Sequence, residues 1–571
     1  MKASDYIARF LEKQGISCVF EMSGGMITHM LDSLNRVTKI RIVSMHHEQA
    51  AAFAADAFGR MTGLPGVAMA TSGPGATNLL TGIGSCHFDS SPAVFITGQV
   101  NRHELRGTRA IRQLGFQETD IVSMAKPITK AAWQVAAPED LPADLRQAFS
   151  IARSGRPGPV LIDVPMDVQR AEVEGDLDVV ENPVSPLTVE ERLLDELFTA
   201  IAKSERPLIL AGGGVRAARA IESFRAFVRN TQIPVVTSLL GVDVIPFDDP
   251  LHVGMIGSYG NRWANLAIGR SDLLIVVGSR LDIRQTGSDT DAFKSGREIF
   301  HVDCEPGEIN NRVAGCHGIY AHLKDFFAAA QHHDTKSTTF LPWLRQIDEL
   351  RKQWPDVAEL ASTKGINPNV FMHALSGLSG SAAAYVVDVG QHQMWAGQSL
   401  ELTSEQRFLT SGGMGSMGFG LPAAIGVALV SGGAPVVVIA GDGGFQANIQ
   451  ELQTVVRNRL AIKIVVINNR CHGMVRQFQE SYFEQRYQST LWGYSCPDFA
   501  KVASAYGISS MTVSDPNACQ EAVEWIWSDA AEPALLQVMV DTYANAYPKI
   551  AFGRPNTEME PFATPIAMES T

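Results

Sequence analysis

Cysteine is scarce in this sequence, and closely spaced cysteine pairs are missing. The chain has seven cysteines in 571 residues, and none of them forms a CxxC pair. A disulfide framework needs regularly spaced cysteines and an oxidising compartment, so the sequence excludes a disulfide-rich secreted domain. Scattered thiols are typical of a reducing compartment, and we therefore expect a cytoplasmic protein.

The sequence also lacks a long apolar run and an excess of basic residues. No stretch of about 18 apolar residues occurs, so no membrane-spanning helix is expected. The first residues, MKASDYIARFLEKQG, place apolar side chains at helical spacing and predict an amphipathic helix instead of a signal peptide. The formal net charge of −13 excludes nucleic acid as the main partner.

The remaining composition is that of an ordinary globular protein with several domains. Hydrophobic residues make up 45% of the chain and charged residues 19%. Domains usually hold about 100–200 residues, so about three are expected here. Apolar runs bounded by Gly, Pro or polar turns alternate with helical periodicity, which predicts parallel sheets flanked by helices. The runs occupy residues 18–22, 40–45, 66–71, 92–98, 159–165, 207–214, 234–241, 272–280, 298–303, 384–390, 435–444 and 462–469.

Two polar stretches divide these runs into three groups. RAEVEGDLDVVENPVSP follows Gln169, and QHHDTKSTT precedes the third group. We expect three consecutive doubly wound α/β domains with parallel sheets, over residues 1–170, 188–330 and 365–545. A polar, Pro-rich tail over 546–571 should lie on the surface. Ligands of such domains bind at the carboxyl ends of strands.

Two strand ends in the third domain carry oxygen ligands. One apolar run delivers Asp442 to a strand end, a helix over 448–456 follows, and the next run delivers Asn469 to the same edge. Mg²⁺ accepts a carboxylate, a neutral carbonyl, phosphate oxygens and water. The glycines beside Asp442 allow phosphates close to backbone N–H groups, and a helix beginning after Gly444 would add its dipole. The spacing therefore predicts a magnesium diphosphate site.

The segment from Gly441 to Gly473 resembles the thiamine diphosphate motif of enzymes that decarboxylate 2-oxo acids. Other segments resemble one branch of that family, the acetohydroxyacid (acetolactate) synthases, and occur in the family's order. These are TSGPGATN from Thr71, GFQETDIV from Gly115, SGRPGPVLIDVP from Ser154, VGQHQMWA from Val389 and SGGMGSMGFGLPAAIG from Ser411. Nearly the whole chain is covered. The resemblance implies a homodimer or tetramer whose active sites combine two chains.

The resemblance assigns roles around the cofactor. Mg²⁺ would be held by the side chains of Asp442 and Asn469 and by the backbone carbonyl of Cys471. The carbonyl of Gly415 would accept from the cofactor's 4′-amino group, and Met417 would bend the cofactor into a V shape. The other residues expected to contact it are Gly73, Asn78, Gln391, His392, Gly441, Gly443, Gly444 and Met474.

Glu48 stands between an apolar run and the alanine-rich segment QAAAFAADAFGR. Relatives carry a glutamate there that bonds the cofactor's pyrimidine nitrogen and so helps to activate its reactive carbon. We expect that role for Glu48, with the alanines packing against a partner subunit. Alone, a glutamate at a helix start would indicate only an interaction with the helix dipole. His46 and His47 receive no role.

The middle domain resembles the FAD-binding domain of the same branch. The glycines that follow the strand at 207–211 would let a ligand approach the backbone, and Asp303 ends a strand where a ribose hydroxyl would need an acceptor. The contacts expected for FAD are Arg156, Gly213, Gly214, Arg280 and Asp303.

The acceptor side of the expected active site keeps some family residues and loses others. Arg284 matches an arginine that would grip an acceptor carboxylate, and Gly25, Phe116 and Gln117 match active-site positions. The family has lysine at Met166, tryptophan at Phe478 and a small residue at Met26, and Ser258 and Tyr259 also differ from the pattern.

Three kinds of function are compatible with the sequence. The leading hypothesis is a carboligase that decarboxylates a 2-oxo acid, with pyruvate as the expected substrate, and transfers the acyl carbanion to a carbonyl acceptor. Arg284 favours a second 2-oxo acid as acceptor, whereas Met26, Met166 and Phe478 favour acetyl transfer to a nucleotide-linked keto sugar. The second kind is a simple 2-oxo acid decarboxylase, and the third is a non-catalytic module.

Overall fold

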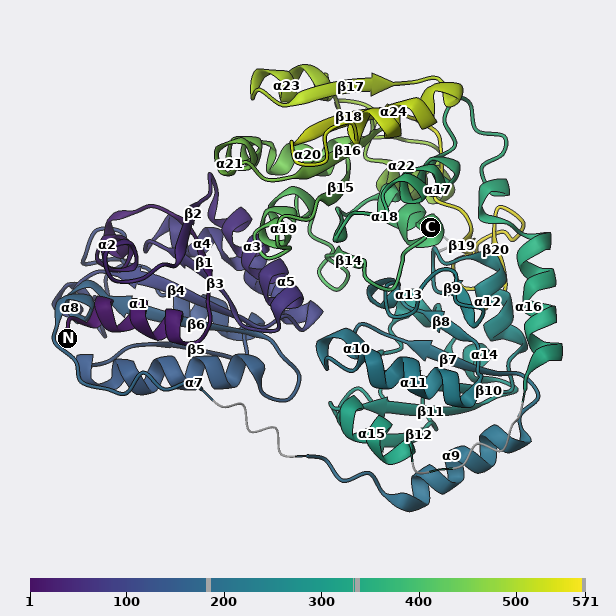
Figure 1. Cartoon of the computed structure of the whole chain (residues 1–571), viewed down its shortest axis with the longest axis horizontal. Helices are drawn as coiled ribbons and strands as arrows, with labels where there is room; N and C mark the ends of the chain where they lie inside the picture. Colours follow the sequence, from purple (N-terminus) through teal and green to yellow (C-terminus); the bar gives the residue numbers. More distant parts are fainter. Residues whose placement is uncertain (181–185, 332, 334–338, 567–571) are drawn as a thin grey trace.

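The computed structural model describes residues 1–180, 186–331, 333 and 339–566. These residues form three six-stranded parallel sheets, each covered by helices, and a short antiparallel pair in the tail. Figure 1 shows the first sheet at the left, the second at the lower right and the third at the top. The three predicted α/β layers are confirmed, and the exact domain limits at 1–170, 188–330 and 365–545 stay predictions.

The first sheet has the order β2-β1-β3-β4-β6-β5. Its central strands are buried on both faces, as their continuous apolar runs predict. The strands are β1 (Cys18–Met22), β2 (Arg41–Ser44), β3 (Gly66–Ala70), β4 (Ala93–Gln99), β5 (Ala131–Gln134) and β6 (Pro159–Pro165). The helices are α1 (Ala3–Lys13), α2 (Thr28–Val37), α3 (Glu48–Thr62), α4 (Pro74–Asn78), α5 (Leu80–Asp89), α6 (Ile121–Ala125), α7 (Leu141–Arg153) and α8 (Met166–Arg170).

The second sheet has the order β12-β11-β10-β7-β8-β9. Its strands are β7 (Pro207–Ala211), β8 (Val235–Thr237), β9 (His252–Met255), β10 (Leu273–Val277), β11 (Glu298–Asp303) and β12 (His317–Tyr320). The helices are α9 (Glu191–Lys203), α10 (Gly214–Ala217), α11 (Ile221–Thr231), α12 (Arg262–Arg270), α13 (Ile283–Thr286), α14 (Thr290–Lys294), α15 (Leu323–Ala330) and α16 (Leu341–Gln353).

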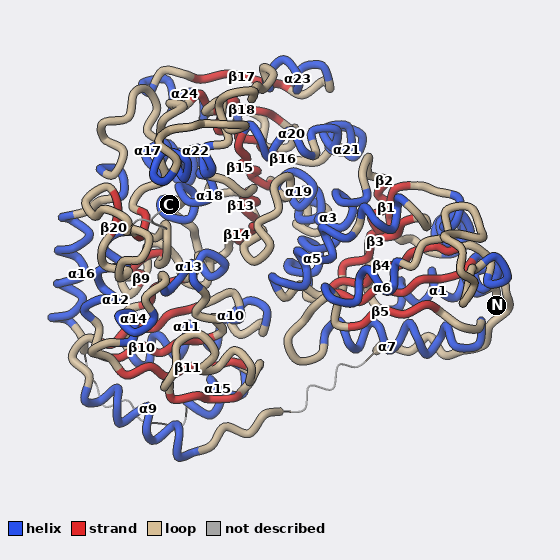
Figure 2. Tube along the Cα trace, turned by 180° about the vertical axis from the view of Figure 1, so that it is seen from behind, coloured by secondary structure: helices blue, strands red, loops and turns tan. Residues whose placement is uncertain are grey.

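The third sheet is again six-stranded and parallel, and its order is β14-β13-β15-β16-β18-β17. Figure 2 shows its strands between two helical layers. The strands are β13 (Ala384–Val387), β14 (Arg407–Thr410), β15 (Val436–Gly441), β16 (Ile462–Asn468), β17 (Ser509–Val513) and β18 (Ala534–Met539). The helices are α17 (Pro368–Leu378), α18 (Gln391–Ser399), α19 (Gly420–Ala428), α20 (Asp442–Ala447), α21 (Leu452–Asn458), α22 (Gly473–Tyr482), α23 (Phe499–Ala505) and α24 (Cys519–Ile526).

The strands that the sequence did not predict lie mainly at sheet edges. The apolar runs correspond to β1–β4, β6–β8, β10, β11, β13, β15 and β16. Of the remaining strands in the three six-stranded sheets, β5, β9, β12, β14 and β17 end a sheet, and only β18 lies inside one. An edge strand needs no continuous apolar run because it is buried less completely. β17, for instance, is largely exposed or half-buried.

The helix predicted over 448–456 is interrupted. A helix begins at Asp442, three residues before the expected start after Gly444, and ends at Ala447. A single 3-10 turn over Ile449–Glu451 then leads into α21. The side chain of Asn448 causes the break, because it donates to the carbonyl of Gly418 across 2.8 Å instead of facing solvent.

The alanine-rich helix α3 packs within the chain. Every residue from Ala50 to Gly59 is buried. The helix lies against α19 of the C-terminal domain, where Phe53 and Phe419 meet edge to face at 5.4 Å between ring centroids. The expected packing of these alanines against a partner subunit is wrong, because α19 of the same chain covers them.

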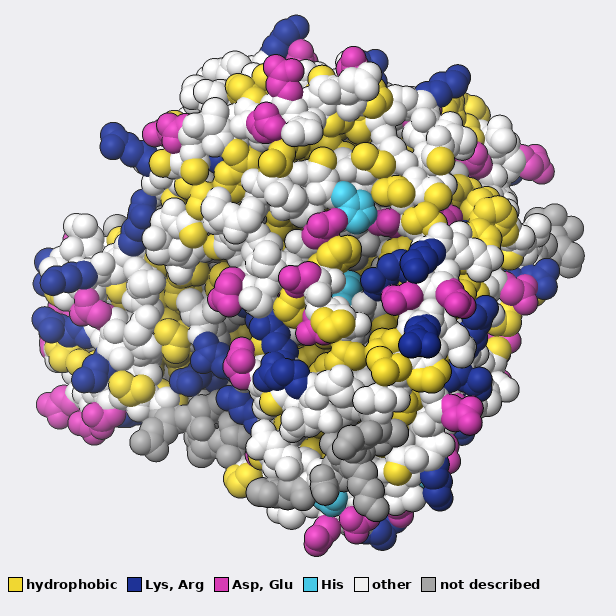
Figure 3. All heavy atoms as spheres, turned by 45° about the vertical axis from the view of Figure 1, so that its right-hand side comes forward, with side chains coloured by type: hydrophobic (Ala, Val, Ile, Leu, Met, Phe, Trp, Pro, Cys, Tyr) yellow, Lys and Arg dark blue, Asp and Glu magenta, His cyan; other side chains and the backbone are white. Residues whose placement is uncertain are grey.

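The tail returns to the central domain. β19 (Lys549–Ile550) pairs with β20 (Met559–Glu560), and the guanidinium of Arg262 donates to the carbonyls of Met559 and Glu560. The last residues, 567–571, lie outside the described part. On the face shown in Figure 3, acidic and basic side chains are interspersed, and apolar side chains gather over its upper part. Among the described residues, no helix combines the length and apolar character needed to cross a bilayer.

Candidate active site

The first cluster lies at the carboxyl edge of the N-terminal sheet. Glu48 follows β2, begins α3 and is 7% exposed. Asn78 donates its side-chain amide to one carboxylate oxygen across 2.9 Å. The other oxygen lies against Gly75, where a Cβ would be 3.2 Å away. Gly73 adopts φ +67° and lies against Gln117, whose own φ is +65°. The structure thus brings Glu48, Gly73, Asn78 and Gln117 together.

The acceptor-side residues surround the same edge. Gly25 is exposed at the start of a 3-10 turn, and a Cβ there would meet nothing within 4 Å. Met26 follows it, and its carbonyl accepts from Gln169 of α8. Met166 begins α8 directly after β6. Phe116 is 79% exposed, which is unusual for so large an apolar side chain.

The two histidines before Glu48 have structural partners. The Nδ1 atom of His47 accepts from the backbone N–H of Gln49 and caps α3. The backbone N–H of His46 donates to Glu451, and its ring contacts Thr454 across 3.1 Å. His46 therefore joins the N-terminal domain to the C-terminal domain. The structure thus gives both histidines structural roles that the sequence alone did not assign.

The second cluster lies at the carboxyl edge of the third sheet. Gly441 of β15 is in register with Ile467 of β16, so Asp442 and Asn469 follow neighbouring strand ends as predicted. Asp442 is 2% exposed, and its Oδ2 atom is buried without a hydrogen-bond partner. Burial raises the pKa of this carboxyl to about 6. A buried, unpaired carboxylate oxygen is costly and needs a cation.

A chain of amides fixes the direction of Asn469. Its Nδ2 donates to the side-chain carbonyl of Gln391 across 3.1 Å, and its Oδ1 accepts from the backbone of Cys471. Gln391 donates in turn to Gln477 and to the carbonyl of Ala544. The side chain of Gln391 is thus engaged by protein partners through both its oxygen and its nitrogen.

The glycines beside Asp442 let neighbouring side chains pack closely against the backbone. A Cβ at Gly441 would meet the ring of His392 at 2.8 Å, and one at Gly443 would meet His472 at 2.6 Å and Met417 at 3.3 Å. Burial lowers the pKa of His392 to about 3, so its ring is neutral.

Met417 therefore lies over the glycine turn while remaining 41% exposed. Gly415 adopts φ +69°, and Gly444 lies against Asp388, where a Cβ would meet a carboxylate oxygen at 2.9 Å. Met474, which follows the glycine that begins α22, is half-buried, and Phe478 on the same helix is 38% exposed.

Asp388 is a site residue that the sequence patterns did not single out. Its carboxylate accepts from the backbone N–H groups of Val389, Gly418 and Gly420, so it ties two glycine-rich motifs together. Burial raises its pKa to about 6, and those hydrogen bonds limit the rise. The sequence offered one signal for this residue. Like Asp442, Asp388 directly follows an apolar strand, and it lies three residues before Gln391.

These residues fit a diphosphate bound through a hard cation. They offer one buried carboxylate oxygen without a partner and one amide oxygen at neighbouring strand ends. In the described part of the chain, no group of three or more His, Cys, Asp or Glu side chains could hold a metal by itself. That is the expected outcome where a single carboxylate acts with an amide, a carbonyl and the ligand's own oxygens.

A cavity of about 620 Å³ lies between the three domains. Arg156 comes from the N-terminal domain, where it donates to Ser90 and pairs with Glu308 at 2.9 Å. Burial raises the pKa of Asp303. The cavity is lined by all the residues expected to contact FAD and by Arg284, namely Arg156, Gly213, Gly214, Arg280, Arg284 and Asp303.

The glycines in this cavity also have a packing role. A Cβ at Gly214 would be 2.6 Å from the backbone of Gly278, and one at Gly213 would be 2.9 Å from Leu240. Arg284 is exposed in the short helix α13.

Comparison with known proteins places these features in a family. Residues 1–124 match the N-terminal thiamine pyrophosphate binding domain of thiamine pyrophosphate enzymes, 194–330 their central domain and 388–538 their C-terminal thiamine pyrophosphate binding domain. The chain belongs to the thiamine pyrophosphate enzymes.

Within that class, the chain belongs to the acetolactate synthase-like branch. It is 35% identical over 560 residues to the acetolactate synthase large subunit of Lactococcus lactis, covering 97% of this chain and 95% of that one. It is 36% identical over 563 residues to the isozyme 2 large subunit of Escherichia coli, covering 98% and 99%. A probable large subunit from Methanocaldococcus jannaschii is 38% identical over 590 residues, covering 100% and 96%.

Proposed function

We propose that this protein decarboxylates a 2-oxo acid, pyruvate in the first instance, and transfers the acyl unit to a carbonyl acceptor, with thiamine diphosphate and Mg²⁺. The observation that carries the proposal is the buried Oδ2 atom of Asp442, which lacks a partner at the carboxyl end of β15, beside the strand end that carries Asn469. The names of the relatives, all acetolactate synthases, support the same reaction.

The C-terminal residues would hold the cofactor. Asp442, Asn469 and the carbonyl of Cys471 would bind Mg²⁺, while Gly441, Gly443 and Gly444 would admit the phosphates to backbone N–H groups. Thiamine diphosphate, when bound, would supply a nucleophilic carbon and an electron sink for the decarboxylation. Gly415 would accept from the cofactor's amino group, and Met417 would support its bent shape.

The N-terminal residues would act on protons. Glu48 would bond the pyrimidine nitrogen, and Asn78 keeps one of its oxygens fixed by donating to it. The other oxygen is then directed by its contact with Gly75. A carboxylate held in one orientation shifts the proton balance of its partner without reorganising during each turnover. We propose that the complete site forms in a cytoplasmic homodimer or tetramer, in which Glu48 faces the diphosphate site of a partner chain.

The interdomain cavity is proposed to hold FAD. Its volume, the glycines at the end of β7 and the arginines at its wall suit a dinucleotide with a diphosphate. Arg156 and Arg280 would face the phosphates, and Asp303 would accept from a ribose hydroxyl. The flavin would be structural, because Glu48 and Asp442 carry the proposed chemistry elsewhere.

A second candidate reaction is acetyl transfer to a nucleotide-linked keto sugar. The observation that favours it is the pair of methionines at the N-terminal sheet edge, Met26 and Met166, which replace a small residue and a lysine of the family pattern. Met166, in place of the lysine, makes that side of the site less cationic. The exposed Phe478 replaces a tryptophan and leaves a wider entrance.

One product analysis tests the proposal. The holoenzyme is incubated with pyruvate, thiamine diphosphate and Mg²⁺, and the products are identified by mass. Acetolactate supports carboligation, whereas CO₂ release that rises only with a keto-sugar nucleotide supports acetyl transfer. Acetaldehyde alone identifies a simple decarboxylase. If no 2-oxo acid is decarboxylated, the proposal is wrong.

A further inference from the structure

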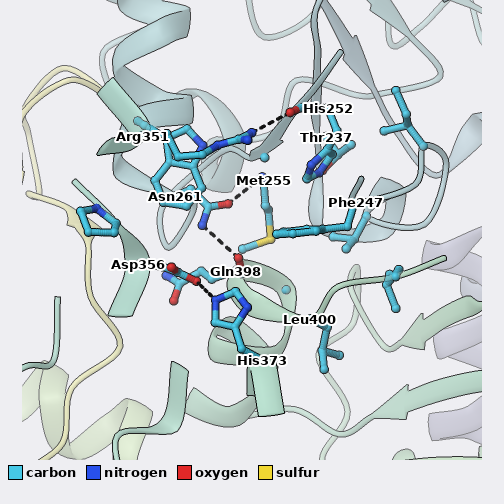
Figure 4. Close-up of a pocket in the computed structure, with 17 residues that line it drawn as sticks. Thr237, Phe247, His252, Met255, Asn261, Arg351, Asp356, His373, Gln398 and Leu400 are labelled. Atoms are coloured by element: carbon cyan, nitrogen blue, oxygen red, sulfur yellow. Dashed lines mark hydrogen bonds and ion pairs between the residues drawn. The ribbon is translucent and has the colours of Figure 1, made fainter. Parts of the chain in front are cut away.

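A second cavity, of about 210 Å³, lies where the central and C-terminal domains meet. Figure 4 shows residues of both domains around it. Thr237 and Met255 come from β8 and β9 of the central sheet, while Gln398 and Leu400 come from the end of α18 and the residue after it. None of the residues expected to contact thiamine diphosphate or FAD lines this cavity, although Met255 borders both cavities.

The walls of this cavity are mainly apolar. Val242, Phe247, Leu400 and Leu402 line it together with the ring of Trp263. The polar groups at its C-terminal side have protein partners: Asp356 accepts from His373 at 2.8 Å and from Ser399, and the Gln398 amide donates to the carbonyls of Tyr259 and Tyr547. A ligand would therefore find no open acidic or amide group on that side.

Arg351 also lines the cavity, but unlike the polar groups on the C-terminal side it has a donor without a partner. Its Nη2 donates to the carbonyls of His252 and Val253 at 2.6 and 2.9 Å, as the dashed line to His252 in Figure 4 indicates, but its Nε is buried without a partner. Among the described residues, Arg351 forms no ion pair, and its guanidinium lies near the ring of Trp263 at 5.7 Å. A half-buried guanidinium without a carboxylate is costly, and an anion would relieve that cost.

His252 does not supply a compensating charge. Burial and the neighbouring Arg351 lower the pKa of its ring to about 3, so the ring is neutral. Asp356 is engaged by His373, whose second nitrogen pairs with Glu401 at 2.8 Å. Asp348 and Asp356 attract Arg351 through their charges, but among the described residues neither carboxylate lies within ion-pair distance of its guanidinium.

The volume of the cavity limits the size of the ligand that it can hold. A cavity of about 150 Å³ accommodates benzene, so about 210 Å³ suits a molecule of six to ten heavy atoms. Binding sites for small molecules typically combine apolar walls with few polar anchors and occur at domain interfaces. We propose that this cavity binds a small aliphatic monocarboxylate, whose carboxylate meets Arg351 and whose hydrocarbon part lies against Phe247, Val242 and Leu400.

Helix α18 links this cavity to the cofactor site. Its first residue, Gln391, orients Asn469, and its last turn carries Gly397 and Gln398 in the cavity wall. Gln398 also donates to the carbonyl of Tyr259, a residue of the flavin cavity. A ligand that moves the last turn of α18 would alter the start of the same helix, and the two sites would change each other's affinity by one common factor.

Calorimetric titration of the holoprotein with 4-methylpentanoate tests the proposal, since this acid lacks the 2-oxo group needed for turnover. We expect saturable binding, and 4-methylpentanamide, its uncharged isostere, should bind at least 10-fold more weakly. Arg351→Gln should weaken binding of the acid at least 10-fold. Lys352→Gln, which removes the same charge from the exposed neighbour on α16, should leave it unchanged.

A filling variant locates the site without touching the charge. Val242→Phe should weaken binding at least 10-fold, whereas Arg284→Gln in the flavin cavity should not affect it. Circular dichroism verifies the fold of each variant, and if Arg351→Gln does not fold, Val242→Phe and the acid–amide pair decide. Absence of binding, equal binding of acid and amide, or equal loss in Arg284→Gln and Val242→Phe would overturn the proposal. Each readout is independent of carboligation, so either proposal can fail alone.

Discussion

The side-chain amide of Asn78 donates to the carboxylate of Glu48 across 2.9 Å, and both groups are carried by the N-terminal domain. The bond holds one oxygen of Glu48 in place and leaves the other against Gly75. Because the two residues come from α3 and α4, the geometry of the proposed catalytic carboxylate is set before any cofactor binds.

Replacing Glu48 by glutamine should lower the rate of pyruvate decarboxylation by about 100-fold or more, since a positioned proton-transfer group contributes about that much. Asn78→Ala should reduce the rate less, by about 10-fold, because it removes only one hydrogen bond to a charged group. Steady-state CO₂ release measures both. Full activity in Glu48→Gln would contradict the role given to this residue.

Asp442→Asn should weaken Mg²⁺ binding at least 10-fold, because the amide cannot offer the buried anionic oxygen that now lacks a partner. Magnesium titrations followed by the quenching of tryptophan fluorescence in the presence of thiamine diphosphate would measure the change. Asp515→Asn, at an exposed helix cap, is the matched control. Equal magnesium affinity in both variants would rule out a ligand role for Asp442.

Arg60→Met should reduce the free energy of unfolding by about 3–5 kcal/mol, the usual loss when one partner of a buried ion pair is removed. Arg60 pairs with Asp56 at 2.6 Å and with Asp89 at 3.0 Å, and it donates to the carbonyl of Thr410 in the C-terminal domain. Urea denaturation of the cofactor-free protein measures the effect. Arg41→Met, at an exposed position, should change it by less than about 1 kcal/mol.

Gly426→Ala should destabilise the contact between α3 and α19. The added Cβ would lie 2.2 Å from the carbonyl oxygen of Ala54, and overpacking of this kind costs about 1–3 kcal/mol. Gly377→Ala is the control, since a Cβ there meets nothing within 4 Å and the residue lies in helix α17. Thermal unfolding of the two variants should show a lower midpoint only for Gly426→Ala.

His373 should make stability depend on pH. Burial lowers its pKa, but hydrogen bonds and charges from Asp356 and Glu401 outweigh burial, so the pKa is raised in the folded protein. The stabilisation is therefore complete below the ordinary histidine value of about 6.5 and is lost as pH rises through the higher folded value. Urea midpoints at pH 6 and pH 9 should differ less in His373→Gln than in the original protein.

The sequence predicted strands well where the strands are completely buried. Asp442 and Asn469 could be placed on neighbouring strand ends because β15 and β16 are continuous apolar runs, and such runs identify central strands of parallel sheets. The edge strand β17, which reads SSMTV, gave no comparable pattern.

The orientation of side chains was beyond the reach of pattern alone. That Gln391 turns its amide towards Asn469 and Gln477 depends on residues far apart in the sequence. The covering of α3 by α19 is likewise a tertiary contact, and an alanine-rich face does not reveal whether the same chain or another will pack on it. Asn448 interrupts a periodic segment for the same reason, because its partner is the distant Gly418.

The hydrogen bonds from Arg262 to the carbonyls of Met559 and Glu560 affect the order in which the chain folds during synthesis. This buried guanidinium also pairs with Glu359 at 2.6 Å, so three of its contacts come from residues translated after it. Domains fold in order as the chain leaves the ribosome, beginning with the N-terminal one. The central domain can therefore reach its final form only after residues 559 and 560 have left the ribosome, which makes the completion of this domain a late event in synthesis.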